Sequence, residues 1–233
     1  MSTIAIITAR GGSKRIPHKN IRNFIGKPVI AYAIDAALKA RVFDRVMVST
    51  DDMGIADIAK RYGAEVPFMR SEKTSDDFAT TTDVLKEVLT TFEAQGEHFD
   101  IACCIYPTAP LLTGERIREA MQLMEEDMAT DVVLPVVRFS YPPQRAFMME
   151  NDTLTIAYPE FKDARSQDLV PFYHDAGQFY LFRTEFLLQN DNLFSGKLRA
   201  MELMETEVQD IDTETDWAMA ELKYQWIHAG EGV

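Results

Sequence analysis

Short apolar runs alternate along this chain with longer stretches in which apolar residues recur every three or four positions. The short runs are typical of buried β-strands, and the longer stretches are typical of amphipathic helices. The predicted strands cover residues 4–8, 45–49, 101–106, 132–137 and 178–182. The predicted helices cover residues 28–40, 53–62, 80–93, 113–126 and 212–228. This order predicts an α/β fold in which a mostly parallel sheet is flanked by helices on both faces.

Three details refine this pattern. Pro28 suits the first turn of the first helix, and in the last helix Trp217, Leu222 and Trp226 are available for packing. Between residues 139 and 172 the alternation stops and prolines accumulate. This excursion could be a β-rich insert, a lid, a dimerisation arm or an ordinary surface loop. Because no linker or repeat is evident, we expect one domain over the whole chain, with the excursion at about 139–170.

Composition narrows the class of protein. The 233 residues are 46% hydrophobic and carry a net charge of −13, which argues against general binding to nucleic acid or to anionic membranes. No apolar run approaches the roughly 20 residues that span a bilayer, and the N-terminus lacks the pattern of a signal peptide. Cys103 and Cys104 are adjacent in an apolar run, so we expect reduced core residues rather than a redox pair. These features predict a cytoplasmic protein.

The charge is reversed in the loop that follows the first predicted strand. Residues 10–27 contain six Lys or Arg and no acidic residue. Two glycines after Arg10 would let backbone N–H groups approach an anion closely. Arg10 could hold phosphate oxygens in a bidentate manner, and Lys14 and Lys19 could act as point charges. The loop matches neither the Walker A nor the dinucleotide-binding pattern, and the alternative interpretation is a solvated basic turn.

An acidic segment lies near the other end of the chain, where residues 200–221 contain eight acidic residues and no Lys or Arg. Asp210 and Asp212 are two positions apart, so in an extended chain they point to the same side. Such a pair suits a hard cation such as Mg²⁺, which also bridges to substrate phosphates. Asp212 could alternatively cap the last helix, and Ile211 is expected to point into the core.

Two further polar clusters accompany predicted strands. The second strand ends in Ser49-Thr50-Asp51-Asp52, whose polar side chains could lie beside a nucleotide or cap the helix that begins at Met53. His174 and Asp175 precede the last strand, but neighbours on extended chain face opposite ways, so a His–Asp dyad is not expected. A basic loop, a carboxylate pair and polar patches together suit nucleotidyl transfer, which needs charge neutralisation more than a protein nucleophile.

These motifs resemble those of the acylneuraminate cytidylyltransferases, the CMP-sialic acid synthetases. Residues 6–20 fit the pattern Ile-Ile-x-Ala-Arg-x-Gly-Ser-Lys-x-x-Pro-x-Lys-Asn, and the similarity continues at residues 48–51, 107–111 and 210–214. The resemblance implies a Rossmann-like nucleotidyltransferase fold with a small dimerisation insert, and therefore a homodimer. It also implies CTP and a nine-carbon sugar acid as substrates, with Mg²⁺, or alternatively Mn²⁺, as the cofactor.

The site residues follow from the resemblance and from the patterns above. For the nucleotide they are Arg10, Gly11, Gly12, Ser13, Lys14, Lys19, Asn20 and Asp51, with either Asp76 or Asp77 beside them. For the sugar acid they are Tyr106, Arg165, Gln167, His174 and Asp175, with Arg165 and Gln167 acting in their own or in a partner subunit. The catalytic set is Arg10, Lys14, Lys19, Asp210 and Asp212, and the two aspartates are the metal ligands.

The sugar pocket departs from the usual sialic acid pattern. Tyr106 replaces a common Gln, Asp175 replaces a common Asn, and Arg15 replaces a common Gly. Residues 103–106 and 173–180 instead resemble the pseudaminic acid cytidylyltransferases of bacterial flagellin glycosylation. The implied reaction is the activation of pseudaminic acid with CTP. The alternatives are the same reaction on N-acetylneuraminic or legionaminic acid, a metal-dependent glycosyltransferase, and a nucleotide-binding regulatory module.

Overall fold

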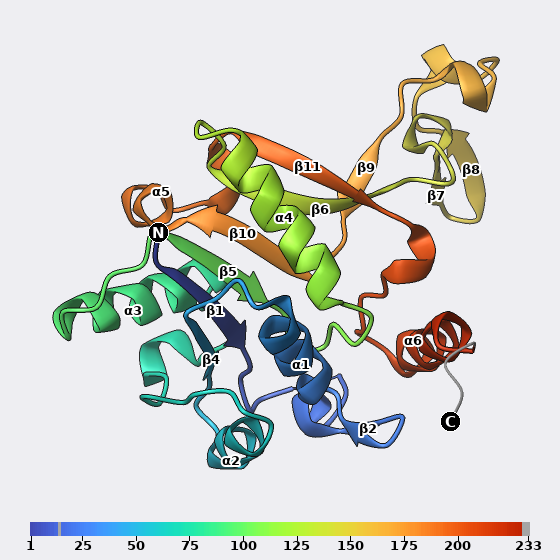
Figure 1. Ribbon diagram of the computed structural model, residues 1–233. Coiled ribbons are helices and arrows are strands. Elements are labelled where there is room, and N and C mark those ends of the chain that lie inside the picture. Colours follow the sequence, from blue (N-terminus) through green and yellow to red (C-terminus); the bar gives the residue numbers. More distant parts are fainter. Residues whose placement is uncertain (14, 230–233) are drawn as a thin grey trace.

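The computed structural model describes residues 1–13 and 15–229, and a seven-stranded sheet with helices on both faces forms its centre (Figure 1). The strands are β1 (Thr3–Thr8), β2 (Asn23–Phe24), β3 (Lys27–Pro28), β4 (Arg45–Ser49), β5 (Ile101–Ile105), β6 (Val132–Arg138), β7 (Phe147–Glu150), β8 (Thr153–Ile156), β9 (Tyr173–Asp175), β10 (Phe179–Arg183) and β11 (Leu198–Leu203). The helices are α1 (Ile30–Ala40), α2 (Met53–Arg61), α3 (Thr81–Ala94), α4 (Gly114–Glu126), α5 (Thr184–Gln189) and α6 (Glu214–Ile227).

The sheet is mixed but mostly parallel, which confirms the predicted fold class. Its strand order is β11-β6-β10-β5-β1-β4, and β9 pairs with β6. β1 runs parallel to β4 and β5, and β11 runs parallel to β6, whereas β10 is antiparallel to both of its neighbours. The carboxyl ends of β1, β4 and β5 therefore meet at one edge of the sheet, the edge at which ligands bind in folds of this kind.

Alternate side chains of the central strands enter two different cores. Cys103 faces the core shared with α1, α2 and α4, whereas Cys104 faces the core beneath α3 and α5. Both thiols are free and fully buried, which confirms the prediction of reduced core residues. Burial raises the pKa of Cys104 to about 12, so the thiol stays protonated and unreactive at neutral pH.

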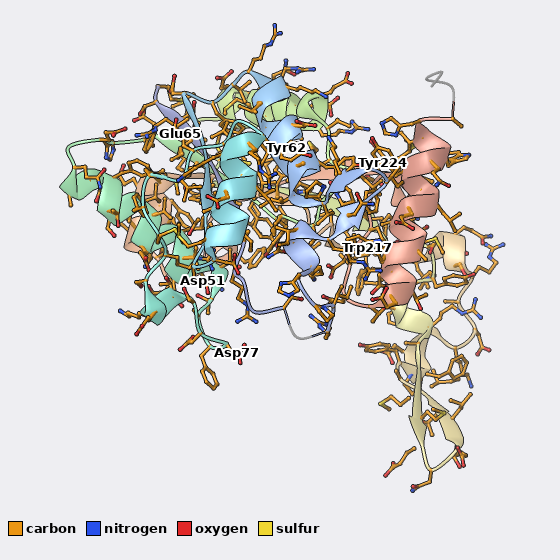
Figure 2. The ribbon with its side chains drawn as sticks, turned by 90° about the horizontal axis from the view of Figure 1, so that it is seen from below. Asp51, Tyr62, Glu65, Asp77, Trp217 and Tyr224 are labelled. Atoms are coloured by element: carbon orange, nitrogen blue, oxygen red, sulfur yellow. The ribbon has the colours of Figure 1, made fainter. Side chains whose placement is uncertain are left out.

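A third, smaller core fixes the C-terminal helix. Trp217 and Ile211 are almost fully buried and pack with Phe24 and its neighbours, as Figure 2 shows for Trp217 and Tyr224 on α6. Leu222 and Trp226, which were also available for packing, are 59% and 66% exposed in the single chain. They lie on the opposite side of α6, which is apolar on more than one face.

Two differences from the predicted elements have local causes. Pro28 does not open α1; it pairs with Asn23 in the β2–β3 hairpin, and Val29 then donates to the carbonyl oxygen of Arg22, so the helix begins at Ile30. β11 was not predicted, because its side chains mix exposed, intermediate and buried positions on an edge strand. The other predicted strands and helices agree with the observed ones to within two residues at each end.

The predicted excursion is an arm. It spans residues 139–172, from the end of β6 to the start of β9, and contains the β7–β8 hairpin and three short 3₁₀ turns. The hairpin stands away from the sheet in both views (Figures 1 and 2). None of the helices in the described part of the chain is long and apolar enough to cross a membrane.

Candidate functional site

A cleft of about 510 Å³ opens beside the carboxyl ends of β1 and β5. Three segments line it: the basic loop after β1, the loop that leads into α3, and the residues that follow β5. The lining residues are Thr8, Arg10, Ser13, Arg15, Lys19, Asn20, Arg70, Thr74, Asp76, Asp77, Ala79, Thr80, Thr81, Val84, Tyr106, Pro107 and Thr108. The structure thus brings together five of the predicted site residues, from Arg10 to Tyr106, and both of the alternatives Asp76 and Asp77. Lys14 lies outside the described residues.

The basic loop is held against the start of α2. The N–H of Gly11 donates to Oδ1 of Asp51 at 2.9 Å, while Asp52 caps α2 by accepting from the N–H of Ile55. The helix cap expected in this segment is therefore Asp52. Asp51 does not line the cleft; it supports the loop that does. A Cβ atom on Gly11 would lie 2.9 Å from Oδ2 of Asp52, so the loop approaches α2 this closely only with glycine.

Arg10 connects the basic loop to the loop before α3. Its guanidinium donates to the carboxylate of Asp77 and to the carbonyl oxygen of Asp76, each at 3.0 Å. Asp51 and Asp77 lie on neighbouring loops on the same side of the molecule (Figure 2). The Asp76 carboxylate instead accepts from the N–H groups of Phe78 and Ala79, which fixes the turn. Of the two alternatives, Asp77 is thus the one whose carboxylate meets Arg10.

Lys19 and Asn20 both line the cleft, and their side chains donate hydrogen bonds to two different segments of the chain. The buried amide of Asn20 donates to the carbonyl oxygen of Arg10 at 2.8 Å, which helps to fix the backbone at Arg10. Nζ of Lys19 donates to the carbonyl oxygen of Ile211 at 2.6 Å and lies 3.5 Å from Oδ1 of Asp212. Lys19 therefore joins the basic loop to the acidic segment.

The acidic pair begins just before α6. Thr213, not Asp212, caps this helix in a reciprocal arrangement with Asp216, so the alternative role of Asp212 as the cap is wrong. Oδ1 of Asp212 lies 2.7 Å from a guanidinium nitrogen of Arg15. Partial desolvation, and next the negative charge of Asp212, raise the pKa of the Asp210 carboxyl above its usual range.

This donor set fits a magnesium ion whose remaining ligands come from substrate and water. Asp210 and Asp212 repel one another, and a divalent cation would relieve that repulsion. Within residues 1–13 and 15–229, no group of three or more His, Cys, Asp or Glu side chains could hold a metal by itself. Mg²⁺ is commonly bound by one or two carboxylates together with substrate phosphates, so a pair is sufficient.

The predicted sugar-binding residues do not all lie together. Tyr106 lines the cleft, whereas Arg165 pairs with Asp168 on the arm and Gln167 lines a separate hollow there. His174 contacts the backbone oxygen of Asp175 rather than its carboxylate, so the expected lack of a His–Asp dyad is confirmed. Within one chain, therefore, the arm residues are not part of the cleft.

Two charged residues of the cleft, Arg15 and Arg70, were not among the predicted site residues, and Arg70 is the buried one. It is only 9% exposed, and its guanidinium donates to the carbonyl oxygen of Ser49 at 2.7 Å and to its hydroxyl at 3.1 Å. Burial lowers the pKa of this guanidinium from its usual high value. The sequence around Arg70 matches no motif. The one available signal is its position directly after the apolar residues that follow Glu65.

Comparison with known proteins adds an independent line of evidence. A family model described as cytidylyltransferase matches residues 4–207. A pseudaminic acid cytidylyltransferase from Campylobacter jejuni is 39% identical over 229 residues, which cover 98% of each chain. A CMP-N,N'-diacetyllegionaminic acid synthase from Legionella pneumophila is 32% identical over 95% of each chain.

Solved structures match in fold at low sequence identity. A CMP:2-keto-3-deoxy-manno-octonic acid synthetase complexed with CTP gives a TM-score of 0.70 at 20% identity, covering 98% of this chain and 100% of its own. A 4-diphosphocytidyl-2C-methyl-D-erythritol synthase from Anaerococcus prevotii gives 0.67 at 15% identity, covering 96% and 98%. The architecture is therefore the Rossmann-like nucleotidyltransferase fold.

Proposed function

Because this chain belongs to the cytidylyltransferase family, we propose that it activates pseudaminic acid with CTP, giving CMP-pseudaminic acid and pyrophosphate. The relative with this activity in its name aligns with the chain over nearly its whole length. The corresponding reactions on legionaminic and N-acetylneuraminic acid are the alternatives. A CMP-N,N'-diacetyllegionaminic acid synthase is 32% identical and an N-acylneuraminate cytidylyltransferase is 34% identical.

One contact carries the proposal: Lys19 lines the cleft and also reaches the acidic segment, 3.5 Å from Asp212. A nucleoside triphosphate bound with a divalent cation needs cationic side chains along its phosphates and carboxylates at the metal. Arg10 and Lys19 supply the first, and Asp210 and Asp212 supply the second. The hydroxyl groups of Ser13, Thr80 and Thr81, with the buried Arg70, offer further hydrogen bonds to the nucleotide.

In the proposed reaction the anomeric hydroxyl of the sugar acid attacks the α-phosphorus of CTP in line. A new phosphorus–oxygen bond forms as the bond to the bridging oxygen breaks, and pyrophosphate leaves. Arg10, Lys14 and Lys19 stabilise the charge that grows on the leaving group. Mg²⁺, or alternatively Mn²⁺, held by Asp210 and Asp212 would neutralise the triphosphate and lower the pKa of the attacking hydroxyl.

The arm supports a homodimer. In the β7–β8 hairpin, Phe147 pairs with Ile156 and Met149 pairs with Leu154, so these four apolar side chains share one face. Phe147, Met149 and Leu154 are 60–73% exposed in the single chain. An apolar face of this kind on an isolated hairpin is best covered by a second copy of the same chain. In such a dimer, Arg165 and Gln167 would be free to approach the partner's cleft.

Pyrophosphate release from CTP and Mg²⁺ tests the proposal, with pseudaminic, legionaminic and N-acetylneuraminic acids supplied in parallel. We expect the highest kcat/KM with pseudaminic acid. A higher value with another of these acids would retain the cytidylyltransferase and overturn the substrate assignment. Folded protein that binds CTP but releases no pyrophosphate with any acid would overturn the proposed function.

A further inference from the structure

Tyr106 lies where the cleft meets the core beneath α3 and α5, and its position depends on a second tyrosine. Tyr180 on β10 stands opposite Cys104 on the neighbouring strand β5, so Tyr180 and Tyr106 share one face of the sheet. Their rings pack edge to face, with centroids 5.7 Å apart and an interplanar angle of 83°. Tyr180 is 5% exposed and Tyr106 lines the cleft.

The hydroxyl of Tyr180 has two side-chain partners, Asp175 and the hydroxyl of Tyr106. It donates to Oδ2 of Asp175, and Oδ1 of the same carboxylate accepts from the N–H of Gly177 at 2.8 Å. Both carboxylate oxygens of Asp175 thus accept a hydrogen bond: one from the hydroxyl of Tyr180 and one from the backbone of the turn that follows β9. A buried phenol without an acceptor would cost about 1–3 kcal/mol, so this contact fixes the orientation of Tyr180.

The same turn lies beside the proposed metal ligand. Gly177 has a φ of +62°, and the atoms nearest to the position of a Cβ there are Cβ and Cγ of Asp210, both at 3.9 Å. Next to it, Nε2 of Gln178 donates to the carbonyl oxygen of Glu207 at 2.6 Å. Residues 175–178 therefore contact the tyrosine pair on one side and the segment that carries Asp210 on the other.

We infer that Asp175 is a positioning residue for the acceptor: it acts through Tyr180 to orient Tyr106 and to hold the acceptor side of the cleft at a fixed distance from Asp210. The inference rests on the proposed function, because the acceptor is the sugar acid of that reaction. It differs from the sequence-based expectation, in which Asp175 contacts the sugar directly.

The two hydrogen bonds accepted at this position require an aspartate rather than a neutral asparagine. A carboxylate can accept from Tyr180 and from Gly177 at the same time, whereas a carboxamide has one oxygen for the two donors. With asparagine, Tyr180 must reorient or the turn must shift. Either change reaches Tyr106 through the ring contact, so the identity of residue 175 influences which acceptor fits.

Asp175→Asn, Tyr180→Phe and the double variant test this inference, with Tyr62→Phe as a control at the C-terminal cap of α2, outside the lining of the cleft. We expect each single variant to raise the KM for the sugar acid about fivefold, the equivalent of one hydrogen bond, while the Kd for CTP stays within about twofold. The double variant should lose little more than either single variant, because both break one contact. Tyr62→Phe should change neither value.

Additive losses in the double variant, or a parallel loss of CTP binding, would overturn the inference. A second readout, the ring signals of ¹³C-labelled tyrosine, does not depend on turnover. Asp175→Asn should move the Tyr106 signal as Tyr180→Phe does, and an unmoved Tyr106 signal would also overturn it. If the wild-type protein released no pyrophosphate with any acid, the proposed function would fail, and these signals would still decide whether Asp175 positions Tyr106.

Discussion

The guanidinium of Arg10 lies 3.0 Å from the carboxylate of Asp77, across the cleft that we assign to the triphosphate. Both side chains are partly exposed, at 37% and 46%, so their attraction is screened and modest, about 0.2–1 kcal/mol for such a pair. A phosphate group offers Arg10 a stronger, bidentate partner. Nucleotide binding is therefore expected to replace Asp77 as the partner of Arg10.

Asp77→Asn should strengthen CTP binding, because it removes a negative charge that competes with the triphosphate for Arg10. We expect the Kd for CTP, measured by calorimetry, to fall about two- to fivefold, in line with an exposed ion pair. Asp191→Asn, which removes the exposed partner of Lys86, is the matched control and should leave the Kd unchanged. Weaker binding by Asp77→Asn would mean that Asp77 itself supports the bound nucleotide.

Two adjacent glycines of the basic loop should respond differently to alanine. At Gly11 a Cβ would meet Asp52, the cap of α2, at 2.9–3.0 Å, whereas at Gly12 it would meet nothing within 4 Å. Gly11→Ala should therefore disturb the cap and lower the free energy of unfolding by about 1 kcal/mol, and it should weaken CTP binding. Gly12→Ala should leave the free energy of unfolding unchanged in thermal melts. Equal effects of the two variants would contradict the close packing of the loop on α2.

Asp210→Asn should reduce kcat about a hundredfold or more without unfolding the protein. The metal is worth several kcal/mol to the transition state, and each 1.4 kcal/mol is a factor of ten. Glu205→Gln removes a charge from the same acidic segment and should leave kcat unchanged. Near-normal activity of Asp210→Asn at limiting Mg²⁺ would show that the metal assignment is wrong.

The same variant has a defined pH dependence in the absence of ligands. Desolvation and Asp212 raise the pKa of Asp210 in the folded state, so the folded protein binds this proton more tightly than the unfolded chain. Stability from this group is therefore present below the unfolded pKa and is lost as the pH rises through the folded pKa. Asp210→Asn should match or exceed the wild-type Tm at pH 7, and this advantage should disappear in acid. An advantage that grew in acid would contradict the raised pKa.

Much of this architecture could be predicted because its signals are local. β1, β4 and β5 are buried on both faces, so they form short apolar runs with polar residues at their ends. Ile211 is buried between two acidic residues, as the alternation of an extended chain requires. The basic loop and the acidic pair were recognisable because each is a charge pattern within a few residues.

The contacts that assemble the site are not local, and the sequence does not reveal them. Lys19 and Ile211 are 192 positions apart, yet they share the hydrogen bond that joins the two charged segments. Arg70 hydrogen-bonds to Ser49, the last residue of β4, from 21 positions further along the chain. The hydrogen bond from Tyr180 to Asp175 was not predicted either. The two residues are five positions apart, and only the turn between them brings the carboxylate to the buried phenol.

The arm provides the last prediction, because its hairpin has two unlike faces. Met149 and Leu154 lie on the apolar face, whereas Thr155 pairs with Met148 on the other. A charge on the apolar face would have to be desolvated in a dimer, at a cost of several kcal/mol. Met149→Glu should therefore convert a dimer to monomers in light scattering, while Thr155→Glu should leave it intact. A wild-type protein that is monomeric at micromolar concentration, or equal dissociation by the two variants, would show that this face does not join two copies of the chain.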